Sequence, residues 1–257
     1  MTADDPTTAP STSTPANPAA PTPEQLSVFA QPGDRLADGP ISLNQFFPFV
    51  LADSMAKRAE LRSIKRTRGV YTPAVDYWRL LRLQIAAYHQ FRQGPGVDAL
   101  TTAIELAHPD RKLHYTTAVT NYRRFIGRKT IEWVDTPRRA VWLADDLRVR
   151  VNPELHITIN GEPHVVKLYL KADKKWALTQ RTANPLAYLI HTCHGHLGKP
   201  LVVDVMRGKA FGLTRPNIDY EALLRAQAAA FTSLWGAQPP PTTNPSAGDG
   251  RGEVAAA

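Results

Sequence analysis

The chain has 257 residues, of which 43% are hydrophobic, so it can form a packed core, and disorder throughout is excluded. Lys and Arg number 31 against 23 Asp and Glu, which gives a net charge of +8. A single cysteine, Cys193, excludes an internal disulfide framework and a cysteine-rich zinc module. No apolar run is long enough to cross a membrane, and the first 25 residues lack the pattern of a signal peptide. We therefore predict a cytoplasmic protein without a membrane partner.

Proline is concentrated at the two ends of the chain. Residues 1–24 consist mainly of Pro, Thr, Ser and Ala, and residues 237–257 repeat this composition. Such segments bury too little apolar area to offset the entropy lost on ordering. We predict disordered tails at residues 1–38 and 237–257. The two Pro-rich ends carry three and one net negative charges, so residues 25–236 carry a net charge of +12.

Residues 39–135 have a helical pattern of apolar positions, and we predict a helical region there. Ser42 followed by Gln45 predicts a capping box ahead of a Phe-rich helix. A second helix is predicted to end at Gly94, and a shorter one covers residues 97–107. A further helix is predicted to end at Gly127.

Residues 136–236 are predicted to form an α/β domain of the mixed α+β kind, in which helices flank a mixed sheet. Leu147, Val149 and Val151 alternate with arginines, as in a strand, and Asn160-Gly161 predicts a hairpin turn. Asn184-Pro185 predicts the start of a helix that ends at Gly195. A buried strand follows at residues 200–206. The last helix has an inner stripe formed by Leu224, Ala228, Phe231 and Trp235.

This order of elements resembles that of the PD-(D/E)XK nuclease superfamily, in which a Pro-Asp step precedes a hairpin and the returning strand carries acid-x-Lys. Pro153-Glu154 resembles the first motif, with Glu in place of Asp. Lys167 stands where the second carboxylate belongs, and Tyr169 stands where the lysine belongs. A shifted frame, Tyr169-x-Lys171, keeps the lysine and still lacks the acid. The resemblance covers about residues 115–235 and implies a restriction-endonuclease-like core; Val203–Lys209 also resembles a segment of uncharacterised bacterial relatives.

The substitution at Lys167 changes the chemistry that this strand can perform. Strand alternation places Val165, Lys167, Tyr169 and Lys171 on one face. A lysine at the ligand position repels a divalent cation and supplies no oxygen, whereas two ammonium groups and a phenol suit a phosphate. We predict phosphate binding by Lys167, Tyr169 and Lys171. In the alternative interpretation, the two lysines are solvated residues of a half-exposed sheet.

Two runs of cations in the helical region are candidate contacts for a nucleic-acid backbone. Arg58, Arg62 and Lys65 are predicted to share one helix face. In the alternative interpretation, both runs are solvated surfaces. Binding of DNA or RNA through these runs would be directed at phosphates and would weaken with salt. The runs consist of Lys57, Arg58, Arg62, Lys65, Arg66 and Arg68, and of Arg123, Arg124, Arg128 and Lys129.

The remaining clusters are interpreted as structural. In the cluster of His191, His194 and His196, the first two are one turn apart and could share a metal ion, but the place of the cluster in the last turn of a helix favours a structural role. Asp145 and Asp146 are predicted on a strand, where neighbours point to opposite faces. The aromatic residues Tyr77, Trp78 and Trp133 are predicted to pack in the core, and in the alternative interpretation they are stacking platforms for bases. Asp204 lies in an apolar strand and needs a partner, for which Arg207 and Lys209 are the candidates.

Three functions are compatible with this sequence. The favoured one is a nucleic-acid-binding protein with a degenerate, non-catalytic nuclease-like domain and no cofactor, acting within a larger protein assembly. The second is an active Mg²⁺-dependent nuclease whose site has migrated to Asp146, Glu154 and Lys171. The third is a protein-interaction scaffold for an acidic partner. The oligomeric state stays open.

Overall fold

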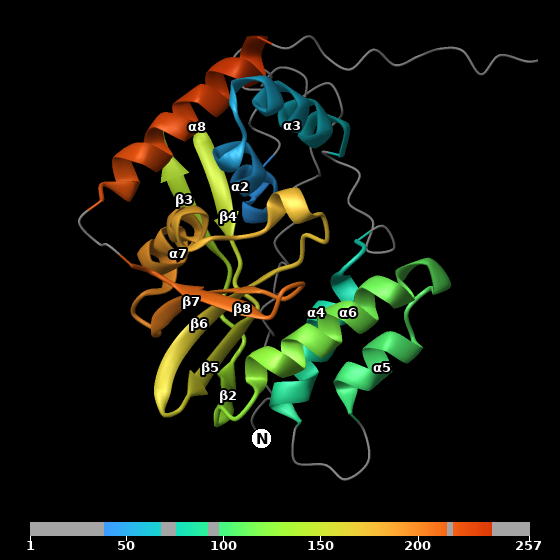
Figure 1. Cartoon of the computed structure of the whole chain (residues 1–257). Coiled ribbons are helices and arrows are strands. Elements are labelled where there is room, and N and C mark those ends of the chain that lie inside the picture. The colour runs from blue at the N-terminus through green and yellow to red at the C-terminus, as the bar shows by residue number, and fades with distance from the viewer. Residues whose placement is uncertain (1–38, 68–75, 92–97, 215–217, 238–257) are drawn as a thin grey trace, which may run out of the picture. The chain divides into compact units, whose positions relative to one another are not determined.

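The computed structural model describes residues 39–67, 76–91, 98–214 and 218–237 (Figure 1). The tail predicted at residues 1–38 lies outside the described residues, and so do Gly94 and all but the first residue of the tail predicted at 237–257. The described residues belong to one compact unit. None of the described helices combines the length and the apolar composition that a membrane span requires.

A five-stranded mixed sheet lies at the centre of the described residues. Its strand order is β2-β5-β6-β7-β8, in which β6 and β7 run parallel and the other neighbours run antiparallel. Helix α7 (Gln180–His194) joins the two parallel strands. The predicted fold class, a mixed sheet flanked by helices, is confirmed, while the restriction-endonuclease-like core stays a prediction. The strands are β2 (Ile131–Asp135), β5 (Leu155–Ile159), β6 (Glu162–Tyr169), β7 (Lys199–Asp204) and β8 (Lys209–Gly212).

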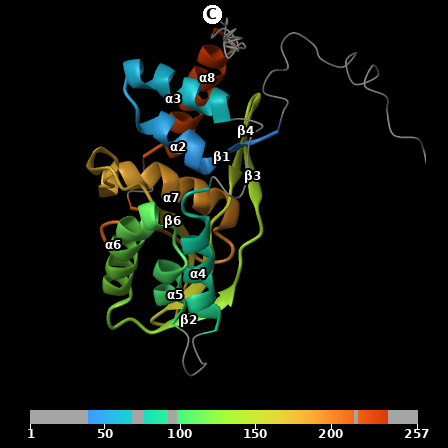
Figure 2. The same ribbon diagram turned by 90° about the vertical axis from the view of Figure 1, so that its right-hand side faces the viewer.

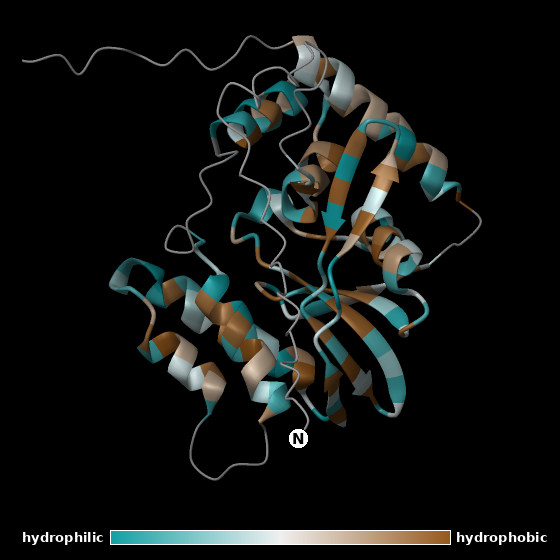
Figure 3. Cartoon of the chain, turned by 180° about the vertical axis from the view of Figure 1, so that it is seen from behind, coloured by the Kyte–Doolittle hydropathy of each residue, from teal (hydrophilic) through white to brown (hydrophobic). Residues whose placement is uncertain are grey.

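A second sheet has the order β1-β4-β3, formed by β1 (Ile41–Ser42), β3 (Ala140–Ala144) and β4 (Leu147–Val151). Strand β4 shows the predicted alternation as hydrophobic and hydrophilic bands (Figure 3). The prediction for Asp145 and Asp146 is wrong, because the two residues form the turn between β3 and β4. Asp145 adopts a φ of +49° there, which an aspartate tolerates better than most residues.

The predicted helices are found with small differences in their bounds. The capping box is confirmed, since the Ser42 backbone N–H donates to Oε1 of Gln45 at 3.0 Å. Gly127 ends its helix with a φ of +48°, as expected for a C-terminal glycine. The helices are α2 (Leu43–Leu51), α3 (Ser54–Thr67), α4 (Arg79–Gln90), α5 (Ala99–Glu105), α6 (Pro109–Ile126) and α8 (Tyr220–Ala237), with a short 3₁₀ helix at Lys174–Trp176.

Two apolar cores lie on opposite faces of the five-stranded sheet. Strand β6 contributes to both, because Val165 and Tyr169 belong to the core formed with α2, α3, α7 and α8. Val166 and Leu168 belong to the core formed with α4, α5 and α6. The predicted alternation of β6 is therefore confirmed. The predicted boundary between residues 135 and 136 divides neither core into separate parts, since each contains residues from both sides of it.

The start predicted for α7 is wrong. The helix begins at Gln180, and the Oγ1 of Thr179 accepts a hydrogen bond from the Thr182 N–H. Asn184 is instead buried inside the helix, where its Nδ2 donates to the Tyr220 hydroxyl at 2.8 Å. Its Oδ1 accepts from Nε2 of Gln180 at 2.8 Å. The capping signal of Asn184-Pro185 is local, and the long-range contact with Tyr220 overrides it.

Candidate functional site

The two residues that carry the sequence resemblance meet in a buried ion pair. Glu154 directly precedes β5, and its backbone N–H donates to the Val166 carbonyl, which places its side chain beside β6. The Nζ of Lys167 donates to Oε1 of Glu154 at 2.7 Å and to the Asn152 carbonyl at 3.0 Å. The Leu168 N–H donates to Oε2 of Glu154 at 2.8 Å. The Lys167 side chain is only 1% exposed, and that of Glu154 is 12% exposed.

This arrangement differs from both interpretations of Lys167. Its ammonium is not solvated on a half-exposed sheet, and it is enclosed by protein oxygens instead of being open to a phosphate. Both carboxylate oxygens of Glu154 already accept hydrogen bonds. A divalent cation at Glu154 would have to displace a buried ammonium from its partner. The pair therefore acts as a structural link between β6 and the start of β5.

A second buried pair joins Asp204 to Arg207. Asp204 is fully buried at the end of β7, paired in parallel register with Tyr169 of β6. The Arg207 guanidinium lies 3.2 Å from Oδ1 of Asp204, so this predicted partner is confirmed, whereas the other candidate, Lys209, is exposed. Burial raises the pKa of Asp204, although the Leu178 N–H and the Arg207 charge oppose this effect. Desolvation of the carboxylate thus outweighs its ion pair.

Arg207 also orders the segment that follows β6. Its guanidinium donates to the carbonyls of Lys171 at 3.0 Å, Ala172 at 3.4 Å and Asp173 at 2.9 Å. The fork of N–H groups in a guanidinium suits several oxygen acceptors at once. The Asp204–Arg207 pair therefore holds the backbone that carries Lys171.

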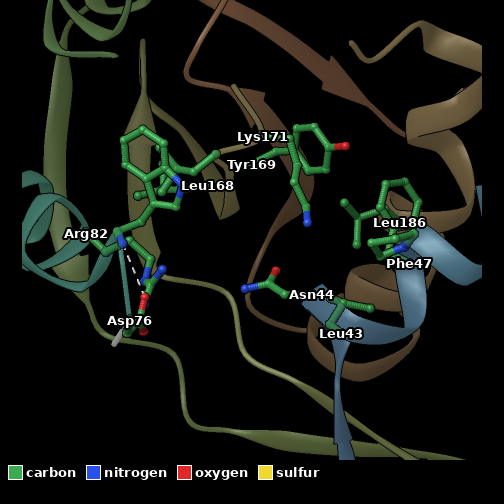
Figure 4. Close-up of a pocket in the computed structure, with 12 residues that line it drawn as sticks. Leu43, Asn44, Phe47, Asp76, Arg82, Leu168, Tyr169, Lys171 and Leu186 are labelled. Atoms are coloured by element: carbon green, nitrogen blue, oxygen red, sulfur yellow. Dashed lines mark hydrogen bonds and ion pairs between the residues drawn. The ribbon is translucent and has the colours of Figure 1, made fainter. Parts of the chain in front are cut away.

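A pocket of about 190 Å³ lies where β6 ends, between α2, the start of α4 and α7. Figure 4 shows the Lys171 ammonium extending into this pocket toward Asn44, with the Asp76–Arg82 ion pair on another wall. The pocket is lined by Leu43, Asn44, Phe47, Pro48, Asp76, Trp78, Arg82, Leu168, Tyr169, Leu170, Lys171 and Leu186.

Tyr169 contributes its ring to the pocket more than its hydroxyl. The hydroxyl points away from the Lys171 ammonium (Figure 4) and has no hydrogen-bond partner among the described residues. Burial raises the pKa of this phenol, and the nearby Asp204 carboxylate adds to the effect. Lys167 and Tyr169 lie on the same face of β6 as predicted, and of the three predicted phosphate ligands only Lys171 has its charged group in the pocket.

Asp146 is not brought to Glu154 or Lys171. It lies in the turn before β4, whereas Glu154 follows the other end of that strand. A five-residue strand spans about 13 Å, so the two carboxylates stand at opposite ends of it. Glu154 is paired with Lys167, and Lys171 lies in the pocket. The three residues assigned to the migrated nuclease site therefore do not form one cluster.

The cations of α3 differ in what their charged groups contact. Nζ of Lys57 donates to Oε1 of Gln227 at 2.6 Å, and Nζ of Lys65 donates to the Trp235 carbonyl at 2.8 Å, so both lysines face α8. Helix spacing does place Lys65 on the side of Arg58 and Arg62, as predicted, but its ammonium bonds the Trp235 carbonyl of α8 and is not open to a phosphate. The exposed cations of α3 are Arg58, Arg62 and Arg66, spaced four apart, which we call the α3 arginine row. Arg68 lies outside the described residues.

In the second cationic run, two of the four cations already bond to other groups of the protein. Arg123 forms an ion pair with Asp98 and donates to Oγ1 of Thr101 at 2.8 Å. The Lys129 ammonium bonds the Phe125 carbonyl and lies 4.8 Å from the centre of its ring. Arg124 and Arg128 are exposed, and neither forms an ion pair within the described part of the chain.

The three histidines at the end of α7 are not equivalent. His194 is buried with 3% exposure, whereas His191 and His196 are exposed. No three His, Cys, Asp or Glu side chains are grouped so as to hold a metal ion within the ranges that the structure describes. Burial lowers the pKa of His194, and a hydrogen bond with the Val151 backbone opposes this shift.

The lowered pKa of His194 predicts a loss of stability in acid. Below the unfolded pKa of about 6.5, the unfolded chain takes up a proton that the buried imidazole refuses. The contribution of the neutral, buried His194 to the free energy of unfolding is complete above pH 6.5 and is lost as the pH falls. We expect His194→Gln to flatten the dependence of the unfolding free energy on pH between 7 and 5, as measured by urea denaturation. His191→Gln at the exposed position should keep the wild-type slope, and equal slopes for all three proteins would contradict the assignment.

Several pocket residues carry no sequence motif. Asn44, Asp76 and Arg82 come from segments far from β6 in the chain, and only the fold brings them to Lys171. Trp78 packs as the sequence predicts, since it stacks on Tyr115 with 5.5 Å between ring centres, and it also lines the pocket. In comparisons with known proteins, no family model matches this chain and no curated protein matches its sequence.

Proposed function

We propose that this protein binds the phosphate backbone of nucleic acid and does not hydrolyse it. The observation that carries the proposal is the α3 arginine row, Arg58, Arg62 and Arg66, exposed on successive turns about 6 Å apart along the helix. Arginine contacts phosphates through several N–H donors and remains charged. The excess of +12 over residues 25–236 favours the same anionic partner.

A second set of exposed arginines lies near the end of α6. Helices α3 and α6 both lie on the right-hand side of Figure 1, which faces the reader in Figure 2. The exposed arginines near the end of α6, Arg124 and Arg128, lie at the end of that helix that faces β2 and is farther from α3, so they form a second basic site apart from the α3 arginine row (Figure 1). Binding of this kind depends on charge and not on base sequence.

The Glu154–Lys167 pair supports the absence of hydrolysis. A two-carboxylate metal site needs oxygen ligands that are open to the ion. In this chain Lys167 stands where the resembled family has its second carboxylate. Its ammonium forms an ion pair with Glu154, so that carboxylate is not open to a metal ion. The nuclease-like ancestry and a degenerate site are thus part of the proposal, together with a role inside a larger assembly.

The test is nucleic-acid binding as a function of salt, measured by fluorescence anisotropy with a labelled 20-base-pair duplex. For about five phosphate contacts, the affinity should fall about 500-fold between 50 and 200 mM NaCl. Chelation of divalent ions with EDTA should leave it unchanged. The double variant Arg62→Glu, Arg66→Glu should weaken binding strongly and reduce the salt slope. Arg181→Glu, at an exposed position on α7, is the control and should have a smaller effect.

Two results would overturn the proposal. The first is the absence of binding at 50 mM NaCl. The second is cleavage of the nucleic acid that requires Mg²⁺ and disappears in Glu154→Ala, which would establish the nuclease instead. A protein complex that survives nuclease treatment while the isolated chain binds no nucleic acid would establish the scaffold.

A further inference from the structure

The pocket at the end of β6 has the size of one ring system. At about 190 Å³ it is smaller than the roughly 300–1,000 Å³ typical of pockets for drug-sized ligands. Its walls are mainly apolar and include Phe47, Leu168, Leu186 and the indole of Trp78. Tyr115 stacks on that indole at an interplanar angle of 14°, which fixes its orientation. A flat apolar group is thus favoured as the occupant.

Two polar groups face each other across this pocket. The Lys171 ammonium and the Asn44 amide both reach into it (Figure 4), and neither has a hydrogen-bond partner among the described residues. An ammonium is a donor, and an amide both donates and accepts. This combination matches the edge of a nucleobase, which carries ring-nitrogen and carbonyl acceptors beside amino donors.

A phosphate fits the pocket less well than a base. A phosphate would use Lys171, but it would also have to contact the apolar walls and lie near the Asp76 carboxylate. Arg82 is already paired with that carboxylate. The apolar surface gains free energy only from an occupant with an apolar face.

We propose that this pocket receives one unpaired nucleobase of a single-stranded nucleic acid. This inference rests on the proposed function and specifies the form of nucleic acid that is bound. A base inside a duplex is covered on both faces and paired along its edge, so only an unstacked base can enter. Helix α2, which supplies Asn44, packs against α3 and lies between α3 and α4 in Figure 2, so one helix separates the pocket from the helix that carries the arginine row.

The experiment compares three labelled ligands at 50 mM NaCl, namely a 12-nucleotide single strand, an abasic strand of the same length and a 12-base-pair duplex. The single strand should bind about tenfold more tightly than the abasic strand, within the range that one stacked base provides. Asn44→Trp fills the pocket from an exposed position and should lower single-strand affinity about tenfold, with abasic and duplex binding unchanged. Gln90→Trp, an exposed residue of α4 that does not line the pocket, should change none of the three affinities.

A second pair of variants keeps the test valid if Asn44→Trp does not fold. Lys171→Ala should weaken binding of the single strand more than binding of the abasic strand. Lys174→Ala removes an exposed ammonium of the neighbouring 3₁₀ helix and should weaken binding of both strands equally. One result would overturn the base pocket and leave the proposed function standing. In that result the single strand and the abasic strand bind equally tightly, both depend on salt, and Asn44→Trp changes neither affinity. No binding of any ligand would overturn the proposed function itself.

Discussion

Lys167→Ala is expected to lower the free energy of unfolding by about 3–5 kcal/mol, because it leaves the Glu154 carboxylate in a largely dry site without its cation. The Asn152 carbonyl loses its donor at the same time. Guanidinium denaturation followed by tryptophan fluorescence measures the change. The matched control is Lys175→Ala, because its ion pair with Asp173 is exposed and should contribute at most about 1 kcal/mol.

A double-mutant cycle separates the ion pair from the packing of the lysine stem. Lys167→Met keeps most of the stem, and Glu154→Gln removes the negative charge but keeps an oxygen acceptor for the Leu168 N–H. The double variant should be more stable than Lys167→Met alone, since no uncompensated charge remains. Additive effects of the two substitutions, or a loss below about 1 kcal/mol for Lys167→Ala, would show that the pair is not the structural link between β5 and β6.

Arg207→Ala is expected to lower the free energy of unfolding by a similar amount, about 3–5 kcal/mol, because Asp204 is fully buried and would lose its cation. The carbonyls of Lys171, Ala172 and Asp173 would also lose a donor. We therefore expect faster amide hydrogen exchange over residues 171–173, measured by mass spectrometry. Arg225→Ala, which breaks a half-exposed pair with Glu221 on α8, is the matched control and should cost at most about 1 kcal/mol.

The pH dependence of Arg207→Ala provides a separate check. Burial already raises the pKa of Asp204, and removal of the arginine charge should raise it further. The folded variant then binds a proton at a pH at which the unfolded chain does not. Its stability deficit should shrink as the pH falls through the folded pKa toward the unfolded value of about 3.9. Asp204→Asn in the same background should remove this pH dependence, and a deficit that is constant with pH would contradict the role assigned to the buried carboxylate.

Elements with strong local signals agree with the sequence prediction. Asn160-Gly161 forms the hairpin between β5 and β6, and both residues have positive φ, as the turn requires. Gly127 ends α6 because its backbone also has a positive φ, which glycine adopts readily. The inner stripe predicted for α8 is buried at all four positions, because helix periodicity alone determines which residues share a face.

Elements whose local signals compete with long-range contacts do not agree. The capping signal at Asn184 yields to the contact with Tyr220, 36 residues away. Lys65 turns toward α8 because the Trp235 carbonyl and ring are close to α3 in the fold. Neither partner is visible from the neighbouring sequence, so helix geometry predicted the spacing of the α3 cations but not which of them face solvent.

The residue pattern alone predicts the charge of the folded part, the fold class and the face of β6 that Lys167 and Tyr169 share. Lys171, predicted on the same strand face, lies two residues past the end of β6. The residue pattern also identified Asp204 as a buried acid in need of a partner, since a carboxylate in an apolar strand has no other stable arrangement. Whether each of these groups is buried, paired or open follows from the packing of the folded chain. Burial and partner are properties of residues distant in the chain, and they enclosed Lys167 with Glu154 while they left Lys171 in a pocket with Asn44.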